Sequence, residues 1–134
     1  MNLSEFREDL EKQESGSPYY IGEDGAIFVK RVGTVQYLKE IESIKRNIYG
    51  FDLKDMDIGL VLGTWLAEYG VTEWENILDE DSKALEFSRT NARKVFLNES
   101  FFNSLNAQLI AHGSNYANYL FDEVTEDIKQ IKKK

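Results

Sequence analysis

The sequence predicts a mainly α fold, namely a small helical domain with a short N-terminal β-hairpin and a long C-terminal helix. Two central stretches carry apolar residues at helical spacing, and each stretch ends at a glycine. An Asp-Gly turn between two short apolar segments near the N-terminus is typical of a hairpin. A last apolar stripe with three- or four-residue spacing continues to about Ile131 and predicts the long helix.

A single domain is expected over residues 1–134, because this length supports one core and is marginal for two. Residues 1–17 are expected to form an N-terminal helix and linker. Residues 18–122 form the predicted core, and residues 123–134 a helix end with a lysine tail.

The N-terminal elements follow from local signals. Residues 3–13 have the spacing of a short charged helix, which ends before Pro18, the only proline. Residues 19–21 and 26–29 are the predicted hairpin strands, because the Asp-Gly pair in the turn at 23–25 tolerates a positive φ.

Two amphipathic helices are predicted next. Thr34 is the expected cap of the first, which ends at Gly50, and Asp55 is the expected cap of the second, which ends at Gly70. The residues that these helices are expected to direct toward the core are Leu38, Ile41, Ile44, Ile48, Ile58, Val61, Leu62, Trp65 and Leu66.

The last third of the chain is predicted to be helical. Ser88 is the expected cap of a helix over residues 89–97, and a second helix is expected from Phe101 to about Ile131. A helix of about 30 residues is ~45 Å long. Because a domain of this size has a radius of gyration of only ~14 Å, the distal end is expected to project or to pack on another subunit.

Composition and charge exclude several classes of protein. The net charge is -8, and without the four lysines among the last six residues 12 basic residues face 24 acidic ones. Such a surface repels phosphate backbones, so no nucleic-acid partner is expected. The most apolar run, residues 58–67, is far shorter than the ~20 residues of a membrane span, and no signal peptide opens the sequence. With no cysteine, the protein is expected to be soluble and cytoplasmic, with no membrane partner.

No group of residues predicts an active site, so the chain is expected not to be an enzyme, with no catalytic residue, metal or cofactor. His112, the only histidine, lies on an apolar stripe and is expected to be a packed residue. Residues 79–81 resemble the start of a calcium-binding loop, but Lys83 and Ala84 break the pattern. An acidic turn is the better interpretation.

The two tryptophans differ in their surroundings. Trp65 lies on the apolar face of its helix and is expected in the core, whereas Trp74 lies in a polar segment. Trp74 either clamps the following turn onto the helical body, which is the favoured interpretation, or anchors a partner. The candidate partner-binding residues are Trp74, Tyr116, Tyr119, Leu120 and Val124.

The order of elements around Trp74 resembles the order found in a known protein family. A helix ends at Gly70 before Val71, a segment with Trp74 follows, and an acidic turn over residues 79–83 comes next. The apolar pair of Leu85 and Phe87 then precedes the Ser88-capped helix, and a final helix runs from Phe101 to Phe121. Over roughly residues 30–122 this order resembles the tail assembly chaperones of long-tailed bacteriophages. The acidic turn of that family often carries a glycine where this chain has Ser82 and Lys83.

The resemblance implies a chaperone-like core over residues 18–122 and a non-enzymatic role in the host cell cytoplasm. Such proteins bind and solubilise the tape measure protein, recruit tail tube subunits during tail morphogenesis, and are absent from the mature virion. Members self-associate, so a homo-oligomer is expected. Many are made in two lengths by a programmed frameshift, and the codons of residues 132–134 are adenine-rich, as slippery sites are.

Two other functions remain open. The acidic surface is also typical of a small acidic regulator or inhibitor that binds a basic protein surface, as a nucleic-acid mimic does. The chain is alternatively a tail structural or completion protein, which would be found in purified virions.

Overall fold

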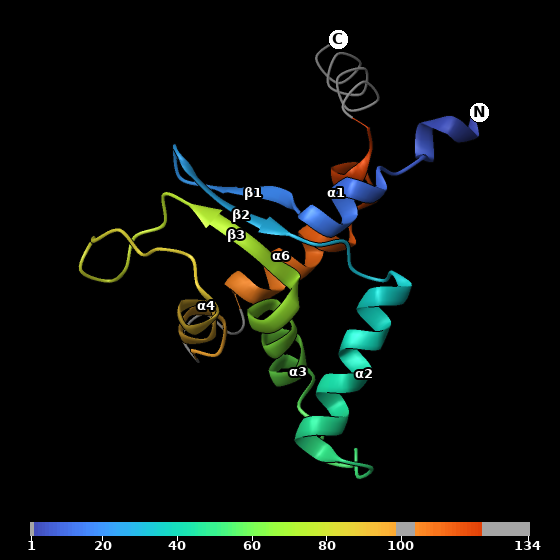
Figure 1. Ribbon diagram of the computed structural model, residues 1–134, viewed down its shortest axis with the longest axis vertical. Helices are drawn as coiled ribbons and strands as arrows, with labels where there is room; N and C mark the ends of the chain where they lie inside the picture. Colours follow the sequence, from blue (N-terminus) through green and yellow to red (C-terminus); the bar gives the residue numbers. More distant parts are fainter. Residues whose placement is uncertain (1, 99–103, 122–134) are drawn as a thin grey trace.

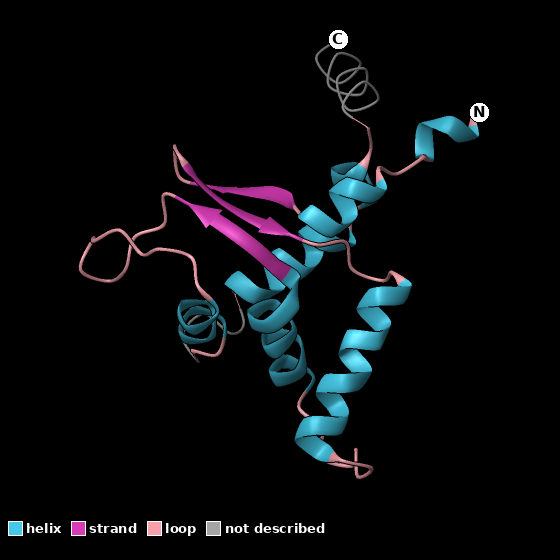
Figure 2. Cartoon of the chain, in the orientation of Figure 1, coloured by secondary structure: helices cyan, strands magenta, loops and turns pink. Residues whose placement is uncertain are grey.

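The computed structural model describes residues 2–98 and 104–121, and over these residues the chain has a mixed α/β fold (Figure 1, Figure 2). A three-stranded antiparallel sheet has the order β1-β2-β3, with β1 at Ser17–Ile21, β2 at Gly25–Val29 and β3 at Val71–Glu75. The predicted mainly α class is therefore wrong. The sheet has one strand more than the predicted hairpin, and the described part of the chain does not contain the long C-terminal helix.

The predicted hairpin is confirmed, and β3 extends it. Strands β1 and β2 pair around the Asp-Gly turn, and β2 pairs with β3 so that Ile27 lies opposite Trp74. Tyr19, Ile27 and Trp74 are cross-strand neighbours, so their side chains share one face of the sheet. Helix α6 (Leu105–Ser114) packs on β1 and β2 (Figure 1).

The predicted N-terminal helix over residues 3–13 is divided into two short elements, a 3-10 turn at Leu3–Phe6 and helix α1 at Leu10–Ser15. Asp9 separates them, because its carboxylate accepts hydrogen bonds from the backbone N–H groups of Glu11 and Lys12 and so starts α1. The backbone of Glu8 pairs with Leu120 in an isolated β-bridge.

Helix α2 (Val35–Tyr49) has the predicted bounds. Thr34 Oγ1 accepts a hydrogen bond from the Tyr37 N–H, and Gly50 ends the helix at a φ of +64°. Ile41 and Ile44 are buried, whereas Leu38 is 55% and Ile48 41% exposed. The core therefore covers only the middle of the predicted apolar stripe of α2.

Helix α3 (Ile58–Trp65) is capped by Asp57 rather than by the predicted Asp55, since the Asp57 carboxylate accepts from the Leu60 N–H at 3.2 Å. The helix continues as a π-helical turn over Leu66–Gly70. A Cβ at Gly70 would lie 2.5 Å from the Trp65 ring. A side chain at this position would therefore displace the buried Trp65 ring, which favours glycine where the chain turns into β3.

Helix α4 (Arg89–Phe96) begins at the predicted cap, because Ser88 Oγ accepts from the Asn91 N–H at 3.0 Å. Between β3 and α4, residues 76–85 form a narrow hairpin that we call the finger, and it projects from the body in Figure 1. The finger is closed by the bridge between Leu78 and Ala84 and by the hydrogen bond from Leu85 N to Ile77 O at 2.8 Å.

The predicted helix from Phe101 to Ile131 is wrong in its described part. Helix α6 ends at Ser114, and a 3-10 turn follows at Tyr116–Tyr119. Asn115 leaves the helical conformation with φ -89° and ψ 111°, and its side chain accepts from the Ala117 N–H. The Asn118 amide donates to the His112 carbonyl at 3.0 Å. Side-chain amides therefore take the hydrogen bonds that would continue the helix.

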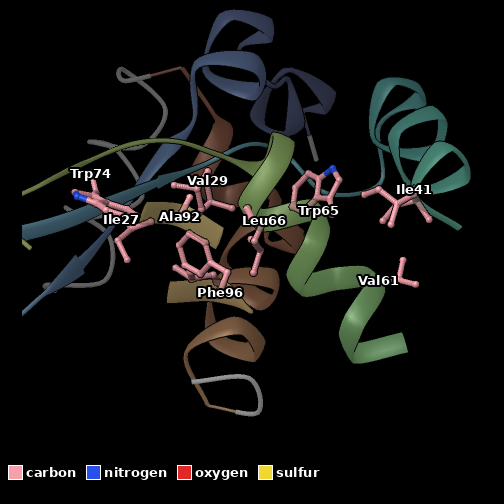
Figure 3. Packing of buried hydrophobic residues seen from close by; sticks show 13 residues of the cluster. Ile27, Val29, Ile41, Val61, Trp65, Leu66, Trp74, Ala92 and Phe96 are labelled. Carbon is pink, nitrogen blue, oxygen red and sulfur yellow. The ribbon is translucent and has the colours of Figure 1, made fainter. Parts of the chain in front are cut away.

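The core lies between the sheet and helices α2, α3, α4 and α6. Figure 3 shows Leu66 and Trp65 between Val29 of the sheet and Ile41 of α2, with Phe96 next to Ala92. The Tyr37 ring meets Trp65 edge-on at 4.9 Å, an orientation that aromatic pairs prefer. Within the described residues, no helix combines the length and apolar character that crossing a membrane requires.

Candidate functional site

An open cleft of about 720 Å³ lies where the finger meets the sheet and the helices α4 and α6. Most of its wall is apolar. The apolar lining residues are Ile21, Ile27, Trp74, Ile77, Leu78, Leu85, Val95 and Leu105. The polar and charged ones are Asp24, Asn76, Asp79, Glu80, Lys94, Asn98, Ser104 and Gln108. A concave apolar site with a few polar groups at its rim is the usual form of a ligand or peptide site.

Trp74 holds the finger against the sheet. The indole Nε1–H donates to the Leu85 carbonyl at 2.6 Å, and the side chain is only 7% exposed. Phe87 and Phe96 meet the indole edge-on at 5.1 Å and 6.2 Å. Figure 3 places Trp74 beside Ile27 at one edge of the core cluster. These contacts support the interpretation of Trp74 as a clamp, and the indole forms part of the cleft wall as well.

The tip of the finger is the predicted acidic turn. Asp79 Oδ1 accepts from the backbone N–H groups of Asp81 and Lys83 at 2.9 Å and 3.0 Å, so this carboxylate organises the turn. Ser82 has a φ of +60°, a conformation that favours glycine. The turn therefore has the geometry of a glycine-containing turn, although this chain places serine there. Among the described residues, no group of three or more acidic, histidine or cysteine side chains could hold a metal ion.

The rim of the cleft is acidic. Asp24, Asp79 and Glu80 lie on it, and Lys94 is the one basic residue among the described lining residues. Glu86 is not among the lining residues of this cleft, and it lines a second, smaller hollow with Phe87. A positive group that enters the cleft would meet mainly carboxylates, and the low-dielectric wall strengthens that attraction.

The structure does not bring together the five predicted partner-binding residues. Tyr119 and Leu120 are fully buried. The Tyr119 hydroxyl donates to the Val29 carbonyl at 2.6 Å, and burial raises its pKa above the usual range. Tyr116 is 40% exposed, and its ring lies 5.5 Å from the Phe6 ring in a tilted orientation. Val124 lies outside the described residues. Trp74 packs against Phe87 and Phe96, away from these positions. Partner binding at these positions stays a prediction.

His112 is part of a hydrogen-bonded chain that resembles a catalytic triad only in outline. The ring Nε2 lies 3.2 Å from Ser17 Oγ, and the Nδ1 lies 3.1 Å from the Asn118 amide nitrogen. The bond to the His112 carbonyl identifies this atom as the amide nitrogen, which can only donate, so Nδ1 is the acceptor in the second contact. The proton therefore resides on Nε2, where it prevents the ring from accepting the Ser17 proton. Burial lowers the pKa of His112, and the arrangement is that of a packed histidine.

A second buried polar group is structural. Glu40 is 5% exposed and accepts from Trp65 Nε1 at 3.1 Å and from Lys30 Nζ at 3.2 Å. The Gln36 amide donates to the same carboxylate at 3.3 Å. Because its oxygens have several donors, this carboxylate fixes α2 to α3 and to the end of the sheet.

The sequence pointed to Trp74 but not to the cleft. The apolar wall combines β2, β3, the finger, α4 and α6. The only local signal was the segment from Val71 to Glu75, in which β-branched and aromatic residues favour a strand. A scan against protein-family models matches no family, and searches of curated proteins and of solved structures find no match.

Proposed function

We propose that the chain is a non-enzymatic tail assembly chaperone of a long-tailed bacteriophage, which binds an apolar helical stretch of the tape measure protein in the cleft. The observation that carries the proposal is the open apolar cleft beside Trp74. The resemblance over residues 30–122 supports the same function. The expected client surface on a long C-terminal helix is replaced in this proposal by the cleft, because Tyr119 and Leu120 belong to the core.

The cleft suits one face of an amphipathic helix. Such a helix presents side chains at positions i, i+3 and i+4, and a groove of this size takes a few of them. Each fully buried leucine or isoleucine contributes about 1.5–3 kcal/mol, while association and ordering together cost about 4–15 kcal/mol. The expected complex is therefore of modest affinity, which suits a chaperone that must release its client when the tube assembles around it.

A second apolar surface lies at the connection between α2 and α3. Phe51 is 96% exposed, and Ile48, Leu53 and Ile58 are each at least 41% exposed. This surface is separate from the cleft lining. Clusters of large exposed apolar side chains mark interaction sites on many proteins. In the proposed function it contacts the tail tube protein or a second copy of the chain.

Co-expression with the tape measure protein tests the proposal. The wild-type chain is expected to raise the soluble fraction of that client. Leu78→Gln should weaken the interaction about tenfold, because it removes a 59% exposed leucine from the cleft wall. Leu38→Gln is the matched control, since Leu38 is 55% exposed on α2 and does not line the cleft.

Circular dichroism of both variants should be unchanged, because both side chains are exposed. A client that is equally soluble with wild type and Leu78→Gln, or that stays insoluble with the wild-type chain, would contradict the proposal. Detection of the chain in purified virions would favour a tail structural or completion protein instead.

One observation favours the acidic regulator as a second candidate. The exposed side of β3 carries Glu73 and Glu75, the finger carries Glu80 and Asp81, and Glu86 follows the finger; all five are exposed. A basic partner surface would fit these carboxylates without using the apolar wall. Leu78→Gln would then leave partner binding unchanged, whereas neutralising Glu80 and Asp81 would weaken it.

A further inference from the structure

Residues 128–134 have a composition opposite to that of the cleft rim. This segment reads IKQIKKK, so it contains two isoleucines, four lysines and no acidic residue. The preceding residues 122–127 contain four acidic side chains and no basic one. Residues 128–134 therefore combine apolar side chains with a net positive charge.

The cleft offers the complementary set of groups. Its wall is apolar around Trp74, Leu85 and Leu105. Its rim carries three carboxylates, and Lys94 is the one cationic side chain among the lining residues that the structure describes. The described part of the chain holds 19 acidic and 12 basic residues, so it carries a net negative charge as a whole. Charges at such a rim attract a basic segment over ~10 Å at 0.1 M salt.

We propose that residues 128–134 of the same chain occupy the cleft when no client is bound, with Ile128 and Ile131 against the apolar wall and the lysines at the acidic rim. The competition between this segment and the client depends on the proposed function. The occupancy of the cleft by the segment does not depend on it.

The chain is long enough for this contact. Phe121 is the last described residue, and Ile128 and Ile131 lie seven and ten residues further, which corresponds to at most ~23–25 Å and ~33–36 Å of extended chain. Helix α6 leads from the cleft toward Phe121, and its ten residues correspond to ~15 Å. The segment can therefore return along α6 to Leu105 and Gln108, which line the cleft.

Paramagnetic broadening in the full-length chain tests the proposal. The sequence has no cysteine, so Gln130→Cys provides one site for a nitroxide label. We expect at least a twofold loss of NMR intensity for the Trp74 indole and for the Val95 and Leu105 methyl groups. The methyl groups of Leu38 on α2 should keep their intensity.

Two sets of substitutions test whether the lysine charges hold the segment in the cleft. Replacing the four lysines by glutamine (Lys129→Gln, Lys132→Gln, Lys133→Gln and Lys134→Gln) should restore the cleft signals. The matched control changes four acidic residues outside the segment (Asp122→Asn, Glu123→Gln, Glu126→Gln and Asp127→Asn) and should leave the broadening in place. Cleft signals as intense as those of Leu38, or broadening that survives the lysine changes, would overturn the proposal.

A mixed sample identifies the molecule that supplies the segment. Isotope-labelled chain without the nitroxide is combined with spin-labelled chain at natural isotope abundance. Broadening that appears only in the mixture would overturn occupancy by the same chain in favour of a second copy. Because no client is present, cleft broadening without client rescue would contradict only the proposed function, and rescue without broadening would contradict only this proposal.

Discussion

At the scale of single residues, His112 links folding to pH. Its ring is half-buried against Ser17, Tyr19, Asn118 and Tyr119, with Nε2 donating and Nδ1 accepting a hydrogen bond. Burial lowers its pKa in the folded state, whereas the unfolded value is about 6.5. Above that pH both states hold a neutral ring. As the pH falls below it, the unfolded state takes up the proton first, so the fold loses stability.

We therefore expect the free energy of unfolding to decrease from pH 7 toward pH 5, and His112→Gln to reduce this decrease. Urea unfolding of both proteins at several pH values measures the difference. Glutamine keeps a donor and an acceptor but does not titrate in this range. Parallel pH profiles for the two proteins would show that acidic side chains, rather than His112, cause the decrease.

At the scale of elements, the correct expectations are those with a local cause. Thr34, Ser88 and Gly50 act as caps because their own side chains or backbone freedom satisfy the adjacent helix ends. Strand β3 was missed because its partner β2 lies more than 40 residues earlier, so the pairing of Trp74 with Ile27 depends on tertiary structure. The cleft was missed for the same reason, since distant segments make its walls.

The predicted long helix shows the opposite error. Apolar spacing continues past residue 114, but Asn115 and Asn118 bind backbone groups with their side chains and end α6. Tyr119 and Leu120 are fully buried, whereas the sequence-based prediction placed them on a partner-binding surface. The regular apolar spacing therefore did not predict which of these residues are buried, since Leu120 is buried whereas Tyr116 is 40% exposed.

Leu120→Ala tests this placement. Because Leu120 is fully buried, truncation should lower the free energy of unfolding by about 2–5 kcal/mol. Tyr116→Ala, in the same 3-10 segment but 40% exposed, should lower it by less than about 1 kcal/mol. Urea unfolding measures both. Equal and small effects would indicate that the segment is an exposed surface, as the sequence-based prediction held.

At the scale of the whole molecule, salt separates the proposed chaperone from an acidic regulator. Raising salt from 0.1 M to 1 M shortens the screening distance from ~10 Å to ~3 Å, whereas burial of apolar side chains in the cleft is retained. A regulator that depends on its carboxylates should lose affinity for its basic partner by at least about a hundredfold, which is a loss of about 2.7 kcal/mol.

A client held by the apolar cleft should keep its affinity within about threefold over the same range, a change of about 0.6 kcal/mol. If residues 128–134 compete for the cleft, salt weakens that competitor too, so the measured client affinity should rise rather than fall. Titration calorimetry with a tape measure peptide at both salt concentrations measures the change. In the variant with four lysines replaced by glutamine the rise should vanish, because the competitor is already lost. A steep fall in affinity for both proteins would instead place the acidic surface, and not the cleft, at the centre of the interaction.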